Sequence, residues 1–147
     1  MPDARPRYRA RVSDATDAVL AANARFYDAF ATRDADAMDE LWSTDVDVAC
    51  VHPGWPPIRG RAQVMASWRS IFDNDDGPTP TCEAPTVALH GDASATVLCR
   101  ERLGNVVLIA TNIFTDGPDG WRLTHHHASA LARVPPTPEL DDDFLPN

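Results

Sequence analysis

A change of hydrophobic period near residue 80 constrains the fold of this chain more than any other feature. Four segments rich in β-branched and apolar residues follow one another, at 81–89, 94–103, 106–114 and 121–131. Short breaks separate them, at Gly91-Asp92, Gly104-Asn105 and 115–120. Such short breaks join strands that run in opposite directions. The second half is therefore predicted to be an antiparallel meander of four strands.

Helical spacing dominates the first half. Behind a candidate cap at Ser13, apolar residues recur every three or four positions, at Ala15, Val19, Ala22, Phe26 and Phe30. Asp34 can cap a second, shorter helix, residues 46–51 are predicted to form a strand, and a third helix follows Gly60 and ends in the polar break 73–80. Three helices and the strands predict an α+β fold whose helices cover one face of a curved sheet.

The length and the two ends predict one domain with tails. The chain has 147 residues, 44% of them hydrophobic, which suits a single globular domain. Residues 1–12 hold two prolines and four arginines and are expected to form a flexible basic arm. Residues 133–147, rich in proline and aspartate, are expected to form an acidic tail. The domain itself is predicted to span 13–132.

Charge and composition disfavour several function classes. The 22 acidic and 13 basic residues give a net charge of -9, which repels nucleic acid and anionic lipid heads. No lysine is present, so Schiff-base chemistry and a Walker-type phosphate loop are excluded. The longest run without a charge, 103–115, is too short to span a bilayer, and no signal-peptide pattern follows the N-terminal arginines. These features predict a cytoplasmic protein without membrane or nucleic-acid partners.

Neither a metal nor a cofactor is predicted. Neighbouring residues of a strand face opposite sides, so the triplet His125-His126-His127 does not form a three-ligand site. His125 and His127 could share one metal only with a ligand from elsewhere. The three cysteines, at 50, 82 and 99, lack the close pairing of a zinc or redox motif and are expected to be buried thiols.

Two further features attract attention as parts of a site. The loop after residue 51 places His52 and Trp55 beside a turn stiffened by prolines, where the tryptophan either stacks on a ligand or plugs one end of the core. Arg100 lies among apolar strand neighbours, and a guanidinium there needs an anion. That anion is either a protein carboxylate, such as Glu83 or Asp47, or a group on a substrate.

Several local strings resemble the nuclear transport factor 2-like superfamily, in particular its SnoaL-like and ketosteroid-isomerase-like branch. The resemblance covers roughly residues 15–131 and is carried by the strings at 26–30, 33–38, 52–55, 60–61, 67–69, 110–114 and 120–129. It implies a cystatin-like, cone-shaped fold whose open end admits a small, mostly apolar molecule, and a homodimer formed through the sheet. By this resemblance and by strand alternation, the pocket is expected to be lined by Tyr27, Trp42, His52, Trp55, Trp68, Arg100, Asn112 and His126. Trp121, Leu123, His125 and His127 are then expected on the opposite face, at the dimer interface.

Two functions follow from this reading. The resemblance implies either a noncatalytic pocket that binds a small molecule, with anionic and carbonyl-bearing molecules both included, or an acid-base lyase, isomerase or cyclase without a cofactor. In the enzyme hypothesis, His126 or His52 takes a proton while Arg100 and Asn112 stabilise an oxyanion. No aspartate is expected at the sheet positions where isomerases of this superfamily carry one. The binding hypothesis is therefore placed first.

Overall fold

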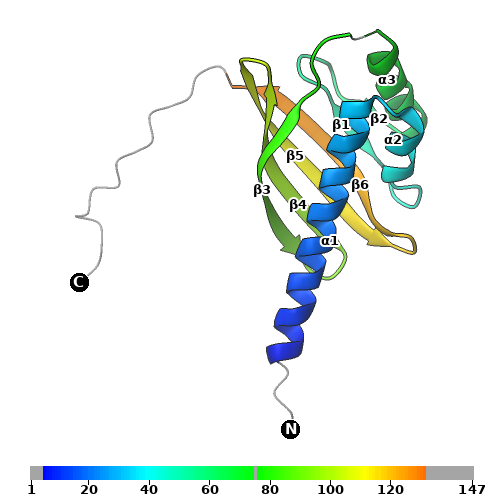
Figure 1. Ribbon diagram of the computed structural model, residues 1–147. Helices are drawn as coiled ribbons and strands as arrows, with labels where there is room; N and C mark the ends of the chain where they lie inside the picture. The colour runs from blue at the N-terminus through cyan, green and yellow to red at the C-terminus, as the bar shows by residue number, and fades with distance from the viewer. Residues whose placement is uncertain (1–4, 75, 132–147) are drawn as a thin grey trace, which may run out of the picture.

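A computed structural model describes residues 5–74 and 76–131 (Figure 1). Three helices are described: α1 (Arg5–Thr32), α2 (Ala35–Leu41) and α3 (Arg61–Asn74). The strands are β1 (Ala49–Val51), β2 (Ile58–Arg59), β3 (Thr81–His90), β4 (Ser94–Leu103), β5 (Val106–Gly117) and β6 (Gly120–Ala130). The predicted α+β class is thus confirmed.

These strands form one open, mixed sheet in the order β2-β1-β6-β5-β4-β3. Strands β3 to β6 pair antiparallel in sequence order, which confirms the predicted meander. The early strand β1 is shorter than predicted. It pairs parallel with β6, an arrangement that needs a long connection, here the α3 segment and the meander. The two-residue strand β2, which follows two prolines, was not predicted from the sequence.

The helices cover one face of the curved sheet, with α1 running obliquely across it (Figure 1). The core between the two layers is formed mainly by large side chains from all three helices and from the inner face of the sheet. Its largest buried apolar members are Phe26, Met38, Trp42, Trp68, Phe114 and Leu123. The predicted cap at Asp34 is confirmed, since its side chain accepts a hydrogen bond from the Ala37 backbone N–H at 3.0 Å.

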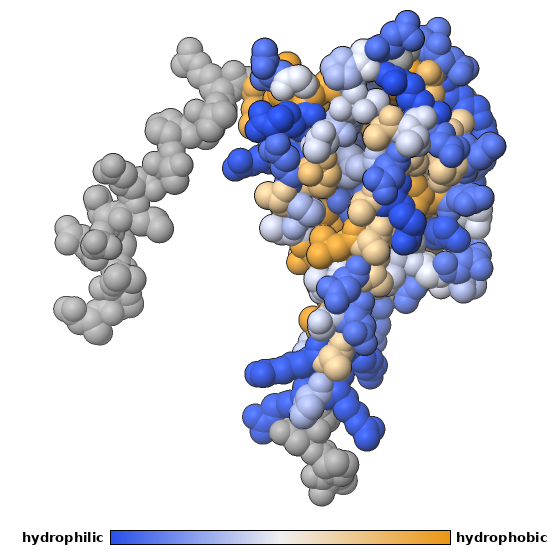
Figure 2. Space-filling model, viewed as in Figure 1, coloured by the Kyte–Doolittle hydropathy of each residue, from blue (hydrophilic) through white to orange (hydrophobic). Residues whose placement is uncertain are grey.

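Helix α1 begins earlier than predicted. Residues 5–12 are helical, although the sequence predicted a flexible arm there and a cap at Ser13. Alanine and arginine are good helix formers, and Pro6 lies in the first turn, where its missing N–H removes no helical hydrogen bond. These turns project beyond the sheet, and Figure 2 shows mainly hydrophilic side chains around them. The predicted tail at 133–147 lies outside the described residues.

A bulge in the β5–β6 hairpin gives the two faces of β6 other residues than predicted. The pairing shifts between Ile113 and Phe114, so that Phe114 lies opposite Leu123 while Ile113 lies opposite His125. The extra residue, Thr124, reverses the alternation along β6. Leu123 is therefore fully buried in the core, and Trp121 packs against that core. The prediction that both join His125 and His127 on the outer face was wrong.

Among the described residues, no helix is both long enough and apolar enough to cross a membrane.

Candidate functional site

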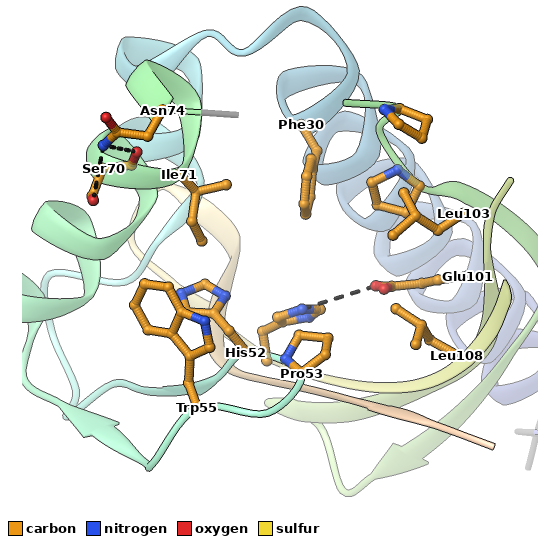
Figure 3. Close-up of a pocket in the computed structure, with 13 residues that line it drawn as sticks. Phe30, His52, Pro53, Trp55, Ser70, Ile71, Asn74, Glu101, Leu103 and Leu108 are labelled. Carbon is orange, nitrogen blue, oxygen red and sulfur yellow. Dashed lines mark hydrogen bonds and ion pairs between the residues drawn. The ribbon is translucent and has the colours of Figure 1, made fainter. Parts of the chain in front are cut away.

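A cavity of about 370 Å³ opens between α1, α3, the loop after β1 and the inner face of the sheet (Figure 3). Most of its lining is apolar. The residues that line it are Phe30, His52, Pro53, Trp55, Ser70, Ile71, Asn74, Pro78, Pro80, Glu101, Leu103, Leu108 and His126. A mainly apolar cavity with a few convergent polar groups is the usual form of a small-molecule site.

Glu101, rather than Arg100, is the charged residue that β4 contributes to this cavity. Ala95, Val97, Cys99 and Glu101 are buried on the inner face of the strand. Arg100 belongs to the opposite set and is exposed, so its predicted place in the pocket was wrong. The apolar residues that seemed to surround it are its sequence neighbours, whose side chains point to the other face or into solvent.

The Glu101 carboxyl is buried, and no guanidinium of the described residues contacts it. Its side chain is 2% exposed, and its Oε1 accepts a hydrogen bond of 2.7 Å from the Tyr27 hydroxyl. Burial raises the pKa of Glu101, and the hydrogen bond from Tyr27 offsets part of this rise. His126 Nε2 lies 3.9 Å from the same carboxylate oxygen. A carboxyl group in such a setting holds a proton more readily than a solvated one.

Two linked side-chain amides, those of Asn23 and Asn112, determine which ring nitrogen of His126 carries the proton. Asn112 Nδ2 donates to Asn23 Oδ1 at 2.9 Å and to the Tyr27 hydroxyl at 3.2 Å. The Oδ1 of Asn112 therefore accepts from Nδ1–H of His126, at 2.6 Å. Desolvation lowers the pKa of His126 to about 3, so the ring is neutral and its Nε2 keeps a lone pair. This lone pair faces Glu101 in the cavity.

His52 is held in the opposite tautomer. The Ser67 hydroxyl donates to the Val64 carbonyl at 2.6 Å, so the 2.9 Å contact between His52 Nε2 and Ser67 is a hydrogen bond donated by the histidine. Its Nδ1 therefore keeps the lone pair. Burial lowers the pKa of His52 to about 4. The ring packs edge-on against Trp68 and Trp55, at centroid distances of 4.7 and 5.0 Å.

The remaining predicted residues occupy three different places. Trp55 lines the cavity and is 44% exposed, as expected of a residue at its mouth. Tyr27 and Asn112 are buried and belong to the hydrogen-bond network behind Glu101 and His126. Trp42 and Trp68 belong to the hydrophobic core and not to the lining.

Glu101 and Asn23 were missed by the sequence analysis. A signal for Glu101 was present, because the apolar alternation Ala95, Val97, Cys99 continues to position 101. For Asn23 the signal was weaker: it lies one turn before Tyr27, on the same helical face. Of the carboxylates predicted to face Arg100, Glu83 does lie directly opposite it on β3, and the charge of Arg100 helps to lower the pKa of Glu83. The hydrogen bonds of Glu83 go to Arg102 instead, the shorter at 2.6 Å.

The fold and the cavity together define a domain of the NTF2-like class with a pocket on the concave side of its sheet. Residues 19–133 match the SnoaL-like domain family, and the chain belongs to that family. The resemblance noted from the sequence strings is thus confirmed.

Solved structures and one curated protein resemble the chain. A candidate dehydratase of the NTF2-like family from Streptomyces avermitilis is 31% identical, with 82% of this chain and 99% of that chain covered and a TM-score of 0.74. An NTF2-like protein with a cystatin-like fold from Novosphingobium aromaticivorans is 25% identical, with coverages of 91% and 94% and a TM-score of 0.70. The predicted cystatin-like fold is therefore confirmed.

The F-box protein SKIP8 of Arabidopsis thaliana is 26% identical over 117 residues, which are 79% of this chain. The chain spans about half of that protein, 51% of its length. The similarity therefore concerns one part of the plant protein only.

Proposed function

We propose that this domain binds a small, mostly apolar molecule that carries a hydroxyl or carbonyl group. The observation that carries the proposal is the placement of Glu101 and His126 among the otherwise mainly apolar lining of one cavity. Both side chains are almost fully buried, and each is oriented from behind by a hydrogen bond, from Tyr27 to Glu101 and from His126 to Asn112. Such fixed polar groups orient a ligand that the apolar walls hold by contact area.

The same charges favour a neutral ligand over an anionic one. Among the residues that the structure describes, the lining includes a carboxyl group and no arginine, and Arg100 is exposed. An anion in the cavity would be desolvated beside the Glu101 carboxyl, and a buried charge without a cationic partner is costly. We therefore propose a neutral ligand instead of the anionic ligand that Arg100 suggested in the sequence.

A thermal-shift screen of small neutral hydroxy and carbonyl compounds tests the binding proposal. We expect hits that raise the unfolding temperature with rising concentration. Glu101→Gln should weaken these hits at least tenfold in Kd, because the orienting carboxyl is lost. Glu83→Gln is the matched control on the outer face and should keep the wild-type Kd. Hits that bind both variants equally well would contradict the assignment of Glu101 to the site.

Acid-base catalysis on the same molecule is the second candidate, and the raised pKa of Glu101 beside His126 favours it. The ionised Glu101 would take a proton from the carbon next to a carbonyl group and later return it to the substrate or to a departing hydroxyl. The lone pair of His126 Nε2 would accept a hydrogen bond from a substrate hydroxyl. The similarity to a candidate dehydratase supports this chemistry, which moves protons only and needs no cofactor.

Turnover of the screen hits separates the two candidates. If the site is catalytic, Glu101→Gln should lower kcat by about 100-fold or more. His126→Gln should raise KM more than it lowers kcat. Hits that bind wild-type protein without being converted at any pH would leave binding as the function and contradict catalysis.

We also propose that the chain forms a homodimer through the outer face of its sheet in the cytoplasm. Val107, Ile109 and Ile113 on β5 lie half-buried on that face, and Leu98 on β4 is 50% exposed. Such a face is a suitable self-complementary surface. Light scattering should give a dimer at micromolar concentration, and Leu98→Arg should give a monomer that keeps its ligand hits. A monomeric wild-type protein would contradict the proposal.

A further inference from the structure

Cys82 and Cys99 lie side by side on the inner face of the β3–β4 hairpin. Cys82 is paired with Glu101, and Cys99 is the next inward-facing residue along β4. The two cysteines are therefore diagonal neighbours on one face of an antiparallel pair, and their thiols are close enough to share a hydrogen bond.

Contacts with one helix hold both sulfur atoms in place. Asn23 Nδ2 donates to Cys82 Sγ at 3.6 Å, and the Tyr27 hydroxyl lies 3.1 Å from Cys99 Sγ. Asn23 and Tyr27 are one turn apart on α1, so the helix fixes the two thiols against the same patch of the sheet. A side-chain hydrogen bond from Cys99 is the largest influence on the pKa of Cys82, and it lowers that pKa. Cys82 is thus the thiol that more readily becomes a thiolate.

The two cysteines differ in access. Cys99 is 5% exposed, whereas Cys82 is only half-buried and lies on β3, which forms one edge of the described sheet. Next to Cys82 the pairing with β4 is interrupted by a bulge between Glu83 and Thr86, where Ala84 has a positive φ of 48°. Diagonal neighbours must approach further to bond, and an edge strand with an adjacent bulge is the part of a sheet that can make this shift.

We propose that Cys82 and Cys99 form a redox-active pair that a peroxide oxidises to an intramolecular disulfide. The Cys82 thiolate attacks one oxygen of the peroxide, the O–O bond breaks, and a sulfenic acid and hydroxide form. The Cys99 sulfur then attacks the Cys82 sulfur, the S–O bond breaks, and water leaves with the Cys99 proton. Two thiols lose two electrons in total, and the peroxide gains them. The new bond would lie beside Tyr27, the donor to Glu101.

Oxidation of the folded full chain by hydrogen peroxide tests this proposal. We expect the three thiols of the chain to fall to one, counted after denaturation, with an intact mass lower by two hydrogen atoms. Peptide mapping should join the peptides that contain Cys82 and Cys99. A reductant should restore all three thiols.

Cys50→Ala is the matched control, because Cys50 is buried on β1 and should not take part. This variant should still form the bond, whereas Cys82→Ser and Cys99→Ser should not. If a serine variant does not fold, the peptide map of the wild-type protein decides alone. Three thiols that persist, a gain of oxygen without a crosslink, a bond to Cys50, or crosslinks only between chains would each overturn the proposal.

Discussion

Two glutamates on the same β-hairpin show how differently the two faces of this sheet treat a carboxylate. Glu83 lies on the outer face, where Arg102 donates to both of its oxygens, at 2.6 and 3.2 Å, and the hydrogen bond lowers its pKa. Glu101 lies on the inner face, where it meets a phenol and a histidine, and burial raises its pKa. The Glu83 carboxylate is thus paired with a cationic side chain of the protein, whereas the Glu101 carboxyl remains available for a ligand.

This difference helps to recognise the site. A buried carboxyl group without a cationic partner destabilises a fold, so its presence at a cavity indicates a role other than stability. An exposed ion pair, such as that of Glu83 with Arg102, contributes little and indicates nothing about function. Substitutions and pH changes that act on one face of the sheet or the other should therefore differ in their effects on stability and binding.

The largest effect is expected from acid on the two buried histidines of the inner side. Both pKa values are lower in the folded protein than the usual 6.5, about 4 for His52 and about 3 for His126. The neutral rings therefore stabilise the fold above pH 6.5, and this contribution is lost as the pH falls through the folded pKa values. For His52 alone, the gap from 6.5 to about 4 corresponds to roughly 3 kcal/mol.

Chemical denaturation between pH 7 and pH 3 measures this loss. His52→Gln and His126→Gln should each make the free energy of unfolding less dependent on pH. His90→Gln, at the exposed end of β3, should keep the wild-type dependence. An unchanged dependence in the first two variants would show that these rings titrate normally in the fold.

Tyr27→Phe is expected to have the next largest effect. It removes the hydrogen bond to Glu101, and a hydrogen bond to a charged group contributes about 1.5 to 3 kcal/mol. The free energy of unfolding should fall by about this amount where Glu101 is ionised, and by less at acid pH, where the carboxyl is protonated. Arg102→Met, which removes the partner of Glu83, should produce a much smaller change at both pH values. Equal losses in the two variants would remove the contrast between the faces.

Arg100→Met is expected to have the smallest effect. The side chain is exposed on the outer face, and surface substitutions of this kind usually change stability by less than about 0.5 kcal/mol. Ligand affinity, measured by titration calorimetry with a screen hit, should also remain at the wild-type value. A loss of binding would show that Arg100 reaches the cavity, as the sequence first suggested.

Much of this fold could be predicted from the sequence, because its signals are local. The meander follows from apolar segments and short turns, and the resemblance strings led to the correct family. The errors arose where a face depends on register. Arg100 was selected for its charge although alternation from Ala95 to Cys99 favours Glu101, and strict alternation misplaced Leu123 because the bulge at Thr124 has no clear sequence signal.

The central claim is that Glu101 is the desolvated carboxyl group of the pocket. A ¹³C NMR titration of the glutamate side-chain carboxyls tests it most directly, with Glu101→Gln and Glu83→Gln used to assign the two signals. We predict that Glu101 titrates above its ordinary pKa of 4.5 and Glu83 below it. A Glu101 carboxyl that titrates at or below 4.5 in the folded, ligand-free protein would contradict this account.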